Sequence, residues 1–281
     1  MKISRRRFLL GAAGIGLLAG GYARFAESRW LERVRATIPP RGAALASPIR
    51  ILLLTDLHWS RSVPLALIDR AVRLGLDERP DLVCLAGDYV TVRQRRDLAP
   101  LSATLAPLAQ AAPALAVLGN HDGGAWSRAH GGASDTRAAE EMLARAGITL
   151  LENRARTLEV AGQRLRVGGA GDLWAERFAP RQLGEALGRG GAERTLLLTH
   201  NSDVKTHLAE THWDLLLCGH THGGQVRLPL VGALVVPLKD RRFVAGRGTW
   251  RERWIYTSRG VGSLFGVRWG CRPEVSLLTL Q

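Results

Sequence analysis

The stretch that decides the fold is Ile49-Arg50-Ile51-Leu52-Leu53-Leu54-Thr55-Asp56-Leu57-His58, an apolar run that ends in an aspartate and a histidine. The run has the length of a buried strand. Asp56 and His58 are two residues apart, so in an extended chain their side chains point to the same side. We therefore expect these two side chains to hold one metal ion together.

Four later apolar runs also stop at polar side chains. Helix-like stretches separate the runs, which is typical of βαβ units and a largely parallel core sheet. Ligands bind at the carboxyl ends of the strands in open α/β sheets, so we expect all these polar side chains on one rim. The runs are 82–85, followed by Gly87-Asp88; 114–118, followed by Gly119-Asn120-His121-Asp122; 195–198, followed by His200; and 215–217, followed by Gly219-His220-Thr221-His222.

The candidate ligands mix carboxylates, an amide and imidazoles, a set that suits zinc, iron or manganese. Two such ions about 3.5–4 Å apart lower the pKa of a bridging water and hold the attacking and leaving oxygens of a phosphoryl transfer. Glycines at 87, 119 and 219 are expected to let the backbone turn sharply where a Cβ would obstruct it. The sequence predicts a hydrolytic site that needs no nucleophilic side chain.

The ordered set D-x-H, G-D, G-N-H-D, H and G-H-T-H resembles the calcineurin-like metallophosphoesterase superfamily, over residues 48–281. The resemblance implies an α/β fold, a four-layer α/β/β/α sandwich with two mixed sheets. The apolar segments 234–236, 254–256 and 275–278 would finish the second sheet. It also implies an enzyme, a binuclear metal-dependent phosphoesterase that hydrolyses phosphodiester or lipid-linked phosphate substrates by a metal-bridging hydroxide.

The same resemblance gives each side chain a role. His121 would be catalytic, stabilising charge on the phosphate or protonating the leaving oxygen, and Asp122, grouped with it, would orient the site from behind. The cofactors would be two divalent metal ions (Mn, Zn or Fe). One ion would be held by Asp56, His58, Asp88 and His222, and the other by Asp88, Asn120, His200 and His220, with Asp88 as the bridge.

One departure from the superfamily pattern narrows the activity. In protein serine/threonine phosphatases the motif runs on as G-D-x-V-D-R-G, and its second aspartate pairs with the catalytic histidine. Here Gly87-Asp88-Tyr89-Val90 continues into Thr91-Val92-Arg93, which lacks that carboxylate. A protein phosphatase is therefore disfavoured, and the group that orients His121 is left open.

Other features resemble the bacterial exported or membrane-associated phosphoesterases, a subgroup that also resembles UDP-diacylglucosamine pyrophosphatases. These features are the arginine-rich start, the continuation 223–229 and the ending 268–274. A pyrophosphatase stays open as an alternative, although a cytoplasmic lipid A step conflicts with export. An inactive exported metal-binding or interaction protein is a further alternative, which the intact ligand set disfavours.

The first thirty residues predict an export signal. Ser4-Arg5-Arg6-Arg7-Phe8-Leu9-Leu10 resembles the twin-arginine signal, and an uncharged Gly/Ala-rich run follows to Ala23. No good A-x-A cleavage site follows, so an N-terminal anchor is the alternative. We expect a signal or anchor over 1–30, a linker over 31–47 and the catalytic domain over 48–281. The partners would include the twin-arginine translocation machinery, and the enzyme would be periplasmic or attached to the outer side of the cytoplasmic membrane.

The net charge of +14 is concentrated at the two ends of the chain. Residues 1–50 hold ten Lys/Arg against two Asp/Glu and residues 231–281 hold nine against three, while the centre balances at twenty each. A neutral centre disfavours nucleic acid, including an exonuclease activity, because phosphate-tracking grooves need clustered Lys/Arg. We expect a membrane surface as partner beside the phosphoester substrate.

The sequence leaves two interpretations open for the C-terminal region and for one loop, and it assigns no functional role to the remaining histidines and the cysteines. The C-terminal region with Trp250, Trp254, Phe265, Arg268 and Trp269 either faces lipid or forms a sheet edge with core tryptophans. The loop 123–132, with Trp126 and His130, either covers the substrate or lies on the surface. His130, His207 and His212 are expected to be solvated, and Cys84, Cys218 and Cys271 to be buried structural thiols.

Overall fold

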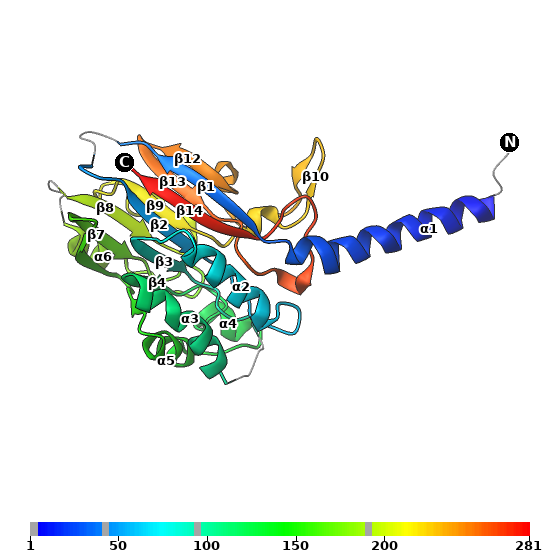
Figure 1. Cartoon of the computed structure of the whole chain (residues 1–281), viewed down its shortest axis with the longest axis horizontal. Helices are drawn as coiled ribbons and strands as arrows, with labels where there is room; N and C mark the ends of the chain where they lie inside the picture. Colours follow the sequence, from blue (N-terminus) through cyan, green and yellow to red (C-terminus); the bar gives the residue numbers. More distant parts are fainter. Residues whose placement is uncertain (1–4, 41–44, 93–96, 189–192) are drawn as a thin grey trace.

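The computed structural model describes residues 5–40, 45–92, 97–188 and 193–281. Two six-stranded mixed sheets pack face to face in the body of the molecule (Figure 1). The strand order is β1-β14-β2-β3-β4-β5 in the first sheet and β12-β13-β9-β8-β7-β6 in the second, and β10 and β11 form a separate hairpin. The predicted α/β sandwich with two mixed sheets is confirmed.

The strands that carry the predicted ligands run parallel to one another within each sheet. In the first sheet β2, β3, β4 and β5 are parallel, and in the second β7, β8, β9 and β13 are parallel. Antiparallel pairing joins β14 to β2, β6 to β7 and β12 to β13. The strands are β1 (Glu32–Ile38), β2 (Ile49–Leu54), β3 (Leu82–Ala86), β4 (Ala114–Val117), β5 (Thr149–Leu150), β6 (Arg154–Val160), β7 (Gln163–Gly169), β8 (Arg194–Leu198), β9 (Leu215–Cys218), β10 (Arg227–Leu228), β11 (Gly232–Ala233), β12 (Gly246–Trp250), β13 (Arg253–Thr257) and β14 (Glu274–Leu280).

Helices cover the outer faces of both sheets. Alternation along β2 separates the layers, because Leu52 and Leu54 pack among the helices while Leu53 packs against the second sheet. α2 (Leu65–Leu76), α3 (Ala99–Ala111) and α5 (Arg137–Arg145) lie on the first sheet, and α6 (Pro180–Leu187) lies on the second. The remaining α-helices are α1 (Arg5–Gly21) and α4 (Ala125–Ala129).

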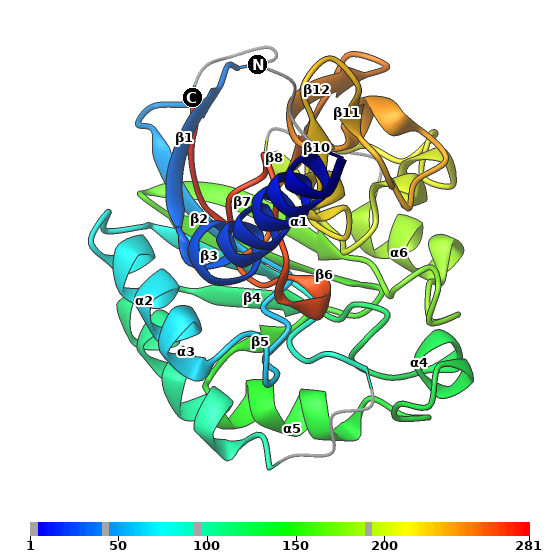
Figure 2. The ribbon, with the colours of Figure 1, turned by 90° about the vertical axis from the view of Figure 1, so that its right-hand side faces the viewer.

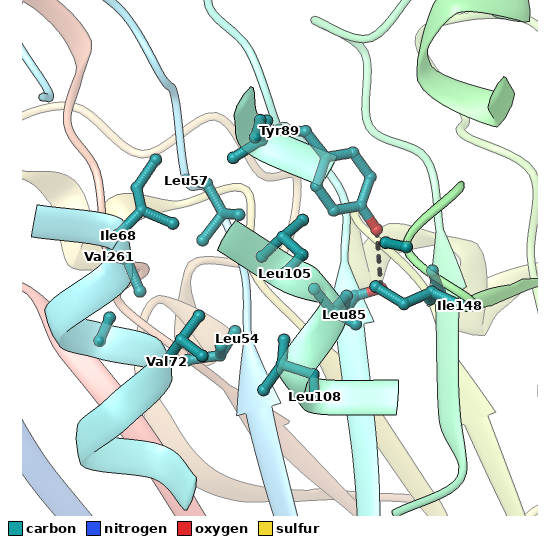
Figure 3. Close-up of a cluster of buried hydrophobic side chains, with 14 of the residues drawn as sticks. Leu54, Leu57, Ile68, Val72, Leu85, Tyr89, Leu105, Leu108, Ile148 and Val261 are labelled. Atoms are coloured by element: carbon teal, nitrogen blue, oxygen red, sulfur yellow. Dashed lines mark hydrogen bonds between the residues drawn. The ribbon is translucent and has the colours of Figure 1, made fainter. Parts of the chain in front are cut away.

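The core between the first sheet and its helices reaches the loop that presents Asp88. Figure 3 shows Leu54 and Leu85 meeting side chains from α2 and α3, with Tyr89 at the edge of the cluster. Tyr89 is buried, and its hydroxyl donates to the carbonyl oxygens of Val117 at 2.9 Å and Leu85 at 3.4 Å. Because Tyr89 follows Asp88 in the chain, this packing fixes the end of β3.

The three cysteines are free and buried, which confirms the prediction of structural thiols. Burial raises the pKa of the Cys84 thiol to about 12. That thiol is therefore protonated at neutral pH and is a poor nucleophile.

Part of the expected linker is a strand. Glu32–Ile38 forms β1, which pairs in parallel with β14 at the edge of the first sheet. The prediction followed the arginines of this stretch and missed its alternation, in which Arg33 and Arg35 point outward and contact Glu78. Residues 41–44 of the expected linker lie outside the described residues, and the boundary at 48 stays a prediction.

Two of the three late segments were also assigned wrongly. Residues 234–236 form no strand, and 275–278 lie in β14, which pairs with β2 and so belongs to the first sheet. Residues 254–256 lie in β13 of the second sheet, as predicted. Apolar runs show that a segment is buried, but pairing with distant strands decides which sheet it joins.

α1 projects away from the sandwich (Figure 1). Its side chains Ile15, Leu17 and Leu18 are more than 70% exposed. Among the described helices, none combines the length and the apolar character needed to cross a membrane. Met1–Ser4, which begin the expected signal, lie outside the described residues, and the role of residues 1–30 stays a prediction.

Candidate metal centre

The predicted ligands, together with His121 and Asp122, converge where the carboxyl ends of the central strands meet. They follow β2, β3, β4, β8 and β9, so both sheets contribute to one rim. All of them are buried, with no more than 8% exposure. They are Asp56 and His58 after β2, Asp88 after β3, Asn120, His121 and Asp122 after β4, His200 after β8, and His220 and His222 after β9.

Asp56, His58 and His222 form a first cluster. The Nε2 atoms of His58 and His222 lie 3.0 Å apart, and His222 Nε2 lies 3.4 Å from Asp56 Oδ1. Two nitrogens that each bind one ion at about 2.0–2.1 Å stand about 3 Å apart. The spacing of the two rings therefore fits a shared cation.

His200 and His220 form a second cluster, with His220 Nδ1 3.1 Å from His200 Nε2. His200 Nδ1 donates to the carbonyl of Ala86 at 2.7 Å, which leaves Nε2 to face the cluster. Asn120 Oδ1 is buried without a hydrogen-bond partner among the described residues. Two facing imidazoles, and a buried acceptor without a partner in the loop that follows β4, fit a second cation.

Asp88 lies between the two clusters. Its Oδ2 is 3.4 Å from His58 Nε2 in the first cluster and 3.2 Å from His200 Nε2 in the second. Its Oδ1 accepts the backbone N–H of His121 at 2.9 Å. This is the position that a bridging carboxylate needs, while the division of ligands between two ions stays a prediction.

Burial sets the charges of these groups. It lowers the pKa of His58 and of His220 to about 3, and neighbouring histidines add to the effect. Burial raises the pKa of Asp56 to about 6. It also acts to raise the pKa of Asp88, but His200 and other histidines outweigh it and hold that pKa well below its usual range. Burial acts to lower the pKa of His200, but the charges of Asp88 and Asp56 outweigh it and hold that pKa well above its usual range. A cation at the second cluster therefore has to displace the His200 proton, whereas the neutral rings of His58 and His220 and the ionised Asp88 already have the forms that bind a cation.

The backbone of five predicted ligands is left-handed. Asp56, His58, Asp88, His220 and His222 have φ angles of 51°, 46°, 56°, 70° and 51°. Such a conformation costs a non-glycine residue about 1–3 kcal/mol, so strain is concentrated at the rim. Asp56 and His58 do lie in one cluster, but tight turns bring them there, and the extended chain assumed from the sequence does not.

The glycines before the ligands act in two different ways. Gly87 has a φ of 82°, as the predicted sharp turn requires. Gly119 and Gly219 do not have positive φ angles, and they make room instead. A Cβ on Gly119 would lie 2.2 Å from Asp88 Oδ1, and one on Gly219 would lie 2.2 Å from Asp56 Oδ2. Both glycines let a ligand carboxylate approach the backbone.

A backbone amide orients His121. The N–H of Val92 donates to His121 Nδ1 at 3.0 Å, so the neutral ring carries its proton on Nε2, which lies 3.9 Å from Asp88 Oδ2. Burial lowers the pKa of His121, against the opposing charge of Asp88. The amide orients the ring as a donor, whereas a carboxylate would have accepted a hydrogen bond from it. A backbone donor cannot be recognised from a sequence motif.

His121 also stands within ligand distance of His58 and Asp88. Its Nδ1 is already occupied by the Val92 amide, and its Nε2 is farther from Asp88 than the 3.2 Å and 3.4 Å of His200 and His58. These contacts favour the predicted role outside the ligand set, which stays a prediction.

Asp122 holds loops together from behind the clusters. Its Oδ2 accepts the N–H groups of Asp88 and Gly119, and its Oδ1 accepts that of Tyr89, each at 2.8 Å. Burial, with the nearby charge of Asp88, raises the pKa of Asp122 to about 7. Its contacts are those of a positioning residue, which is the orienting role implied by the sequence.

Two tryptophans that the sequence did not assign to the site flank the histidines. The Trp126 ring lies 4.5 Å from that of His121, and the Trp174 ring lies 4.4 Å from that of His220. His130 is exposed, as predicted, but it stacks on Trp126 at 4.0 Å. The loop 123–132, which includes α4, therefore stands beside the site, although the sequence left its place open.

Arg268 is fully buried, so the suggestion that it faces lipid is wrong. Its guanidinium donates to the carbonyls of Gly260 at 3.0 Å, of Gly262 and Cys271 at 3.1 Å, and of His222 at 3.4 Å. It fixes the backbone behind His222. A buried arginine needs acceptors from distant segments, which the sequence does not display.

Comparison with known families decides the class of protein. The family model described as calcineurin-like phosphoesterase matches residues 49–224. The chain belongs to this family. The match runs from the first residue of β2 to just beyond His222, so it contains every predicted ligand. This calcineurin-like phosphoesterase is a hydrolase of phosphoester bonds.

Similarity to other members extends over the whole chain. Phosphodiesterase YaeI from Escherichia coli (strain K12) is 44% identical over 281 residues, 99% of each chain. The uncharacterized metallophosphoesterase YkuE from Bacillus subtilis (strain 168) is 29% identical over 304 residues, 100% of this chain and 98% of its own. UDP-2,3-diacylglucosamine pyrophosphatase LpxG from Chlamydia trachomatis is 24% identical over 295 residues, 88% of each.

Proposed function

We propose that this metallophosphoesterase uses two metal ions to hydrolyse a phosphodiester or a lipid-linked phosphate at a membrane surface. The observation that carries the binuclear centre is the place of Asp88, whose Oδ2 stands within 3.4 Å of an imidazole nitrogen in each of the two clusters. Similarity to a relative named as a phosphodiesterase supports the substrate class.

The donor set fits two divalent ions. Imidazole and carboxylate donors suit zinc, iron or manganese, and when bound these ions supply Lewis acidity at the phosphoryl oxygens and a water acidic enough to attack. The first ion would lie among Asp56, His58, Asp88 and His222, and the second among Asp88, Asn120, His200 and His220.

In this proposal His121 donates the proton that the reaction needs at the phosphate or at the leaving oxygen. With Nδ1 held by the Val92 amide, its Nε2–H is free to donate to a phosphoryl oxygen or to protonate the leaving oxygen. A cavity of about 340 Å³ adjoins His121 and is lined in part by Val90, Leu98 and Ala139. These apolar side chains accommodate the leaving group.

The membrane location is proposed from the N-terminal region. α1 carries no acidic residue, and its Ile15, Leu17 and Leu18 side chains are exposed. We propose export by the twin-arginine route and retention at the outer side of the cytoplasmic membrane. A tethered enzyme meets lipid substrates in two dimensions, which raises their effective concentration.

A pyrophosphatase is the second candidate, supported by the similarity to LpxG. Binuclear chemistry on a phosphoanhydride would use the same clusters and the same His121 proton. An aryl phosphodiester, phospholipid esters of short and long acyl chain, and a UDP-linked diacylglucosamine separate the two candidates.

The test uses the full chain in detergent, supplied with manganese, zinc or iron. We expect hydrolysis of the diesters, faster turnover of the longer-chain lipid, and close to two metal ions per chain by elemental analysis. Cleavage of the UDP-linked substrate alone would select the pyrophosphatase, and an absence of any hydrolysis would select the inactive protein. In cell fractionation, recovery of a shortened chain in the periplasmic fraction would contradict the anchor.

A further inference from the structure

The large apolar side chains that the structure leaves exposed are not scattered over the described surface. All of them belong to three segments, 15–30, 226–239 and 264–272, which we call the apolar end. They are Ile15, Leu17, Leu18, Tyr22, Phe25, Trp30, Leu228, Leu230, Val231, Leu234, Val235 and Phe265. Contiguous exposed apolar surface marks an interaction site.

The three segments lie side by side, because specific contacts join them. The ring of Tyr22, after α1, meets that of Trp269 at 5.9 Å. Trp269 pairs with Val226 at the base of the β10–β11 hairpin, and its carbonyl accepts the N–H of Arg227 at 2.7 Å. Figure 2 shows α1, the hairpin and the neighbouring C-terminal loop gathered on the same side of the molecule.

The hairpin and the C-terminal loop present their apolar tips outward. Leu230 at the turn of the hairpin is 109% exposed, and Phe265 is 85% exposed. Phe265 has a φ of 57°, a strained conformation for a phenylalanine that no burial of its ring offsets. Strain that holds an apolar ring in water points to a surface that the ring contacts.

The charges of the apolar end suit an anionic lipid surface. The three segments contain six Lys/Arg, of which Arg268 is buried, and one acidic residue. That residue, Glu27, is buried and accepts the N–H of Cys271. Asp240 and Arg241 follow the second segment, and Arg241 donates to the carbonyl of Ala233 in the hairpin. Basic side chains among apolar tips are typical of segments that lie in a lipid interface.

The apolar end is connected directly to the metal centre. Gln225 follows the His222-Gly223-Gly224 turn, and its side-chain amide exchanges two hydrogen bonds with the backbone of Leu264, at 2.9 Å and 2.8 Å. Arg268 holds the carbonyl of His222 from the same loop. Hydrogen bonds therefore join the base of the hairpin and the C-terminal loop to the rim.

We infer that the β10–β11 hairpin and Phe265 insert into an anionic lipid surface as a second contact beside α1, and that they hold the metal centre at the lipid interface. This inference rests on the proposed membrane location and deepens it. A single helix would tether the enzyme in any orientation, whereas two separate contacts fix which side faces the lipid. Long-chain phosphoesters then reach the site without leaving the membrane.

The test measures insertion at single positions in the full chain. The native cysteines are buried, so an introduced cysteine takes a fluorescent label selectively. Labels go on Ile15→Cys, Leu230→Cys, Phe265→Cys and, as control, Glu159→Cys. Glu159 is exposed near the 161–162 turn, which contacts Ser47 at the start of β2 and so lies at the opposite end of the strands from the rim.

The labelled proteins are bound to phosphatidylcholine vesicles that contain phosphatidylglycerol and lipids brominated in their acyl chains. We expect quenching at positions 15, 230 and 265, and none at 159. Quenching at 15 alone would overturn this inference and leave the proposed membrane location intact. An absence of quenching at all four positions would overturn both.

A second measurement tests the consequence for activity. Leu230→Asp combined with Val231→Asp should slow hydrolysis of a long-chain ester in vesicles at least about tenfold, because each apolar side chain contributes to insertion. Hydrolysis of a soluble short-chain ester should be unchanged. Arg164→Asp, exposed at the far end of β7, makes the same change of two charge units and should alter neither rate. Equal slowing on both esters would contradict the inference.

Discussion

The rim and the apolar end depart from the usual distribution of side chains in opposite directions. At the rim, Asp56 and Asp88 are almost fully buried among histidines, whereas at the apolar end Leu230 and Phe265 stand in water. Buried polar groups and exposed apolar patches are the informative exceptions to the rule that apolar residues lie inside. Here one short stretch, from His222 to Leu230, contains both exceptions, and Gln225 connects them.

The two regions also differ in what holds them. Several hydrogen bonds hold the rim, since Asp122 joins two loops and Arg268 holds the backbone of His222. The tip of the hairpin is held only by the pairing of the short strands β10 and β11 and by the contacts at the base of the hairpin. We therefore expect substitutions at the rim to cost activity and stability, and substitutions at the exposed tips to cost neither in solution.

The largest effect should come from Asp88→Asn, which tests whether the buried carboxylate between the two clusters is needed for activity. Removing one charge from the carboxylate between the clusters should lower kcat about 10³-fold or more, because metal-ion catalysis contributes several kcal/mol. The folded structure should persist in circular dichroism. Glu159→Gln, an exposed change of the same kind, serves as control, and full turnover by the Asp88 variant or by metal-stripped protein would contradict the proposed mechanism.

His121→Ala separates chemistry from metal binding. We expect kcat to fall by about 10²–10⁴, the range of a general acid or base, while elemental analysis still finds about two metal ions per chain. His212→Ala, half-exposed and outside the site, should leave kcat unchanged. Loss of one metal equivalent from the His121 variant would show that this histidine is a ligand.

Arg268→Met tests how much the arginine that joins the C-terminal loop to the backbone of His222 contributes to stability. It leaves several buried carbonyls without a donor, so we expect the free energy of unfolding to fall by about 3 kcal/mol in urea titration. Arg242→Met, with a side chain 71% exposed, should cost less than about 1 kcal/mol. Equal stability of the two variants would mean that water replaces the Arg268 contacts.

The smallest effect on stability should come from replacing a glycine by alanine, once at the rim and once at the apolar end. Gly219→Ala should cost about 1–3 kcal/mol and weaken metal binding, because the new methyl group would displace Asp56. Gly16→Ala in α1 meets nothing within 4 Å and should cost no stability, since alanine favours a helix. Calorimetry and metal titration compare them, and a harmless Gly219→Ala would show that the rim relaxes around a methyl group.

The sequence predicted the identities of the rim residues because they come directly after apolar runs. Asp56, Asp88 and His200 each stand two residues beyond the end of a strand, and parallel strands present their carboxyl ends at one edge. It failed where a contact joins distant segments without a residue-specific signal. The amide of Val92 beside His121 and the carbonyls around Arg268 are backbone groups, which every residue possesses.

The sequence by itself predicted buried strands that end in ligands, the order of those ligands and their chemistry, because apolar runs and ligand type are properties of local stretches. The four-layer sandwich followed from the resemblance of the ordered motifs to the superfamily. Only the tertiary structure decided that Glu32–Ile38 completes the first sheet beside β14, since pairing depends on a partner far along the chain. It also decided that Trp126 and Trp174 flank the histidines, and that Phe265 stands beside α1 and the hairpin. These positions depend on the packing of segments that are far apart in the sequence, and a local pattern of residues does not indicate which distant segment it will contact.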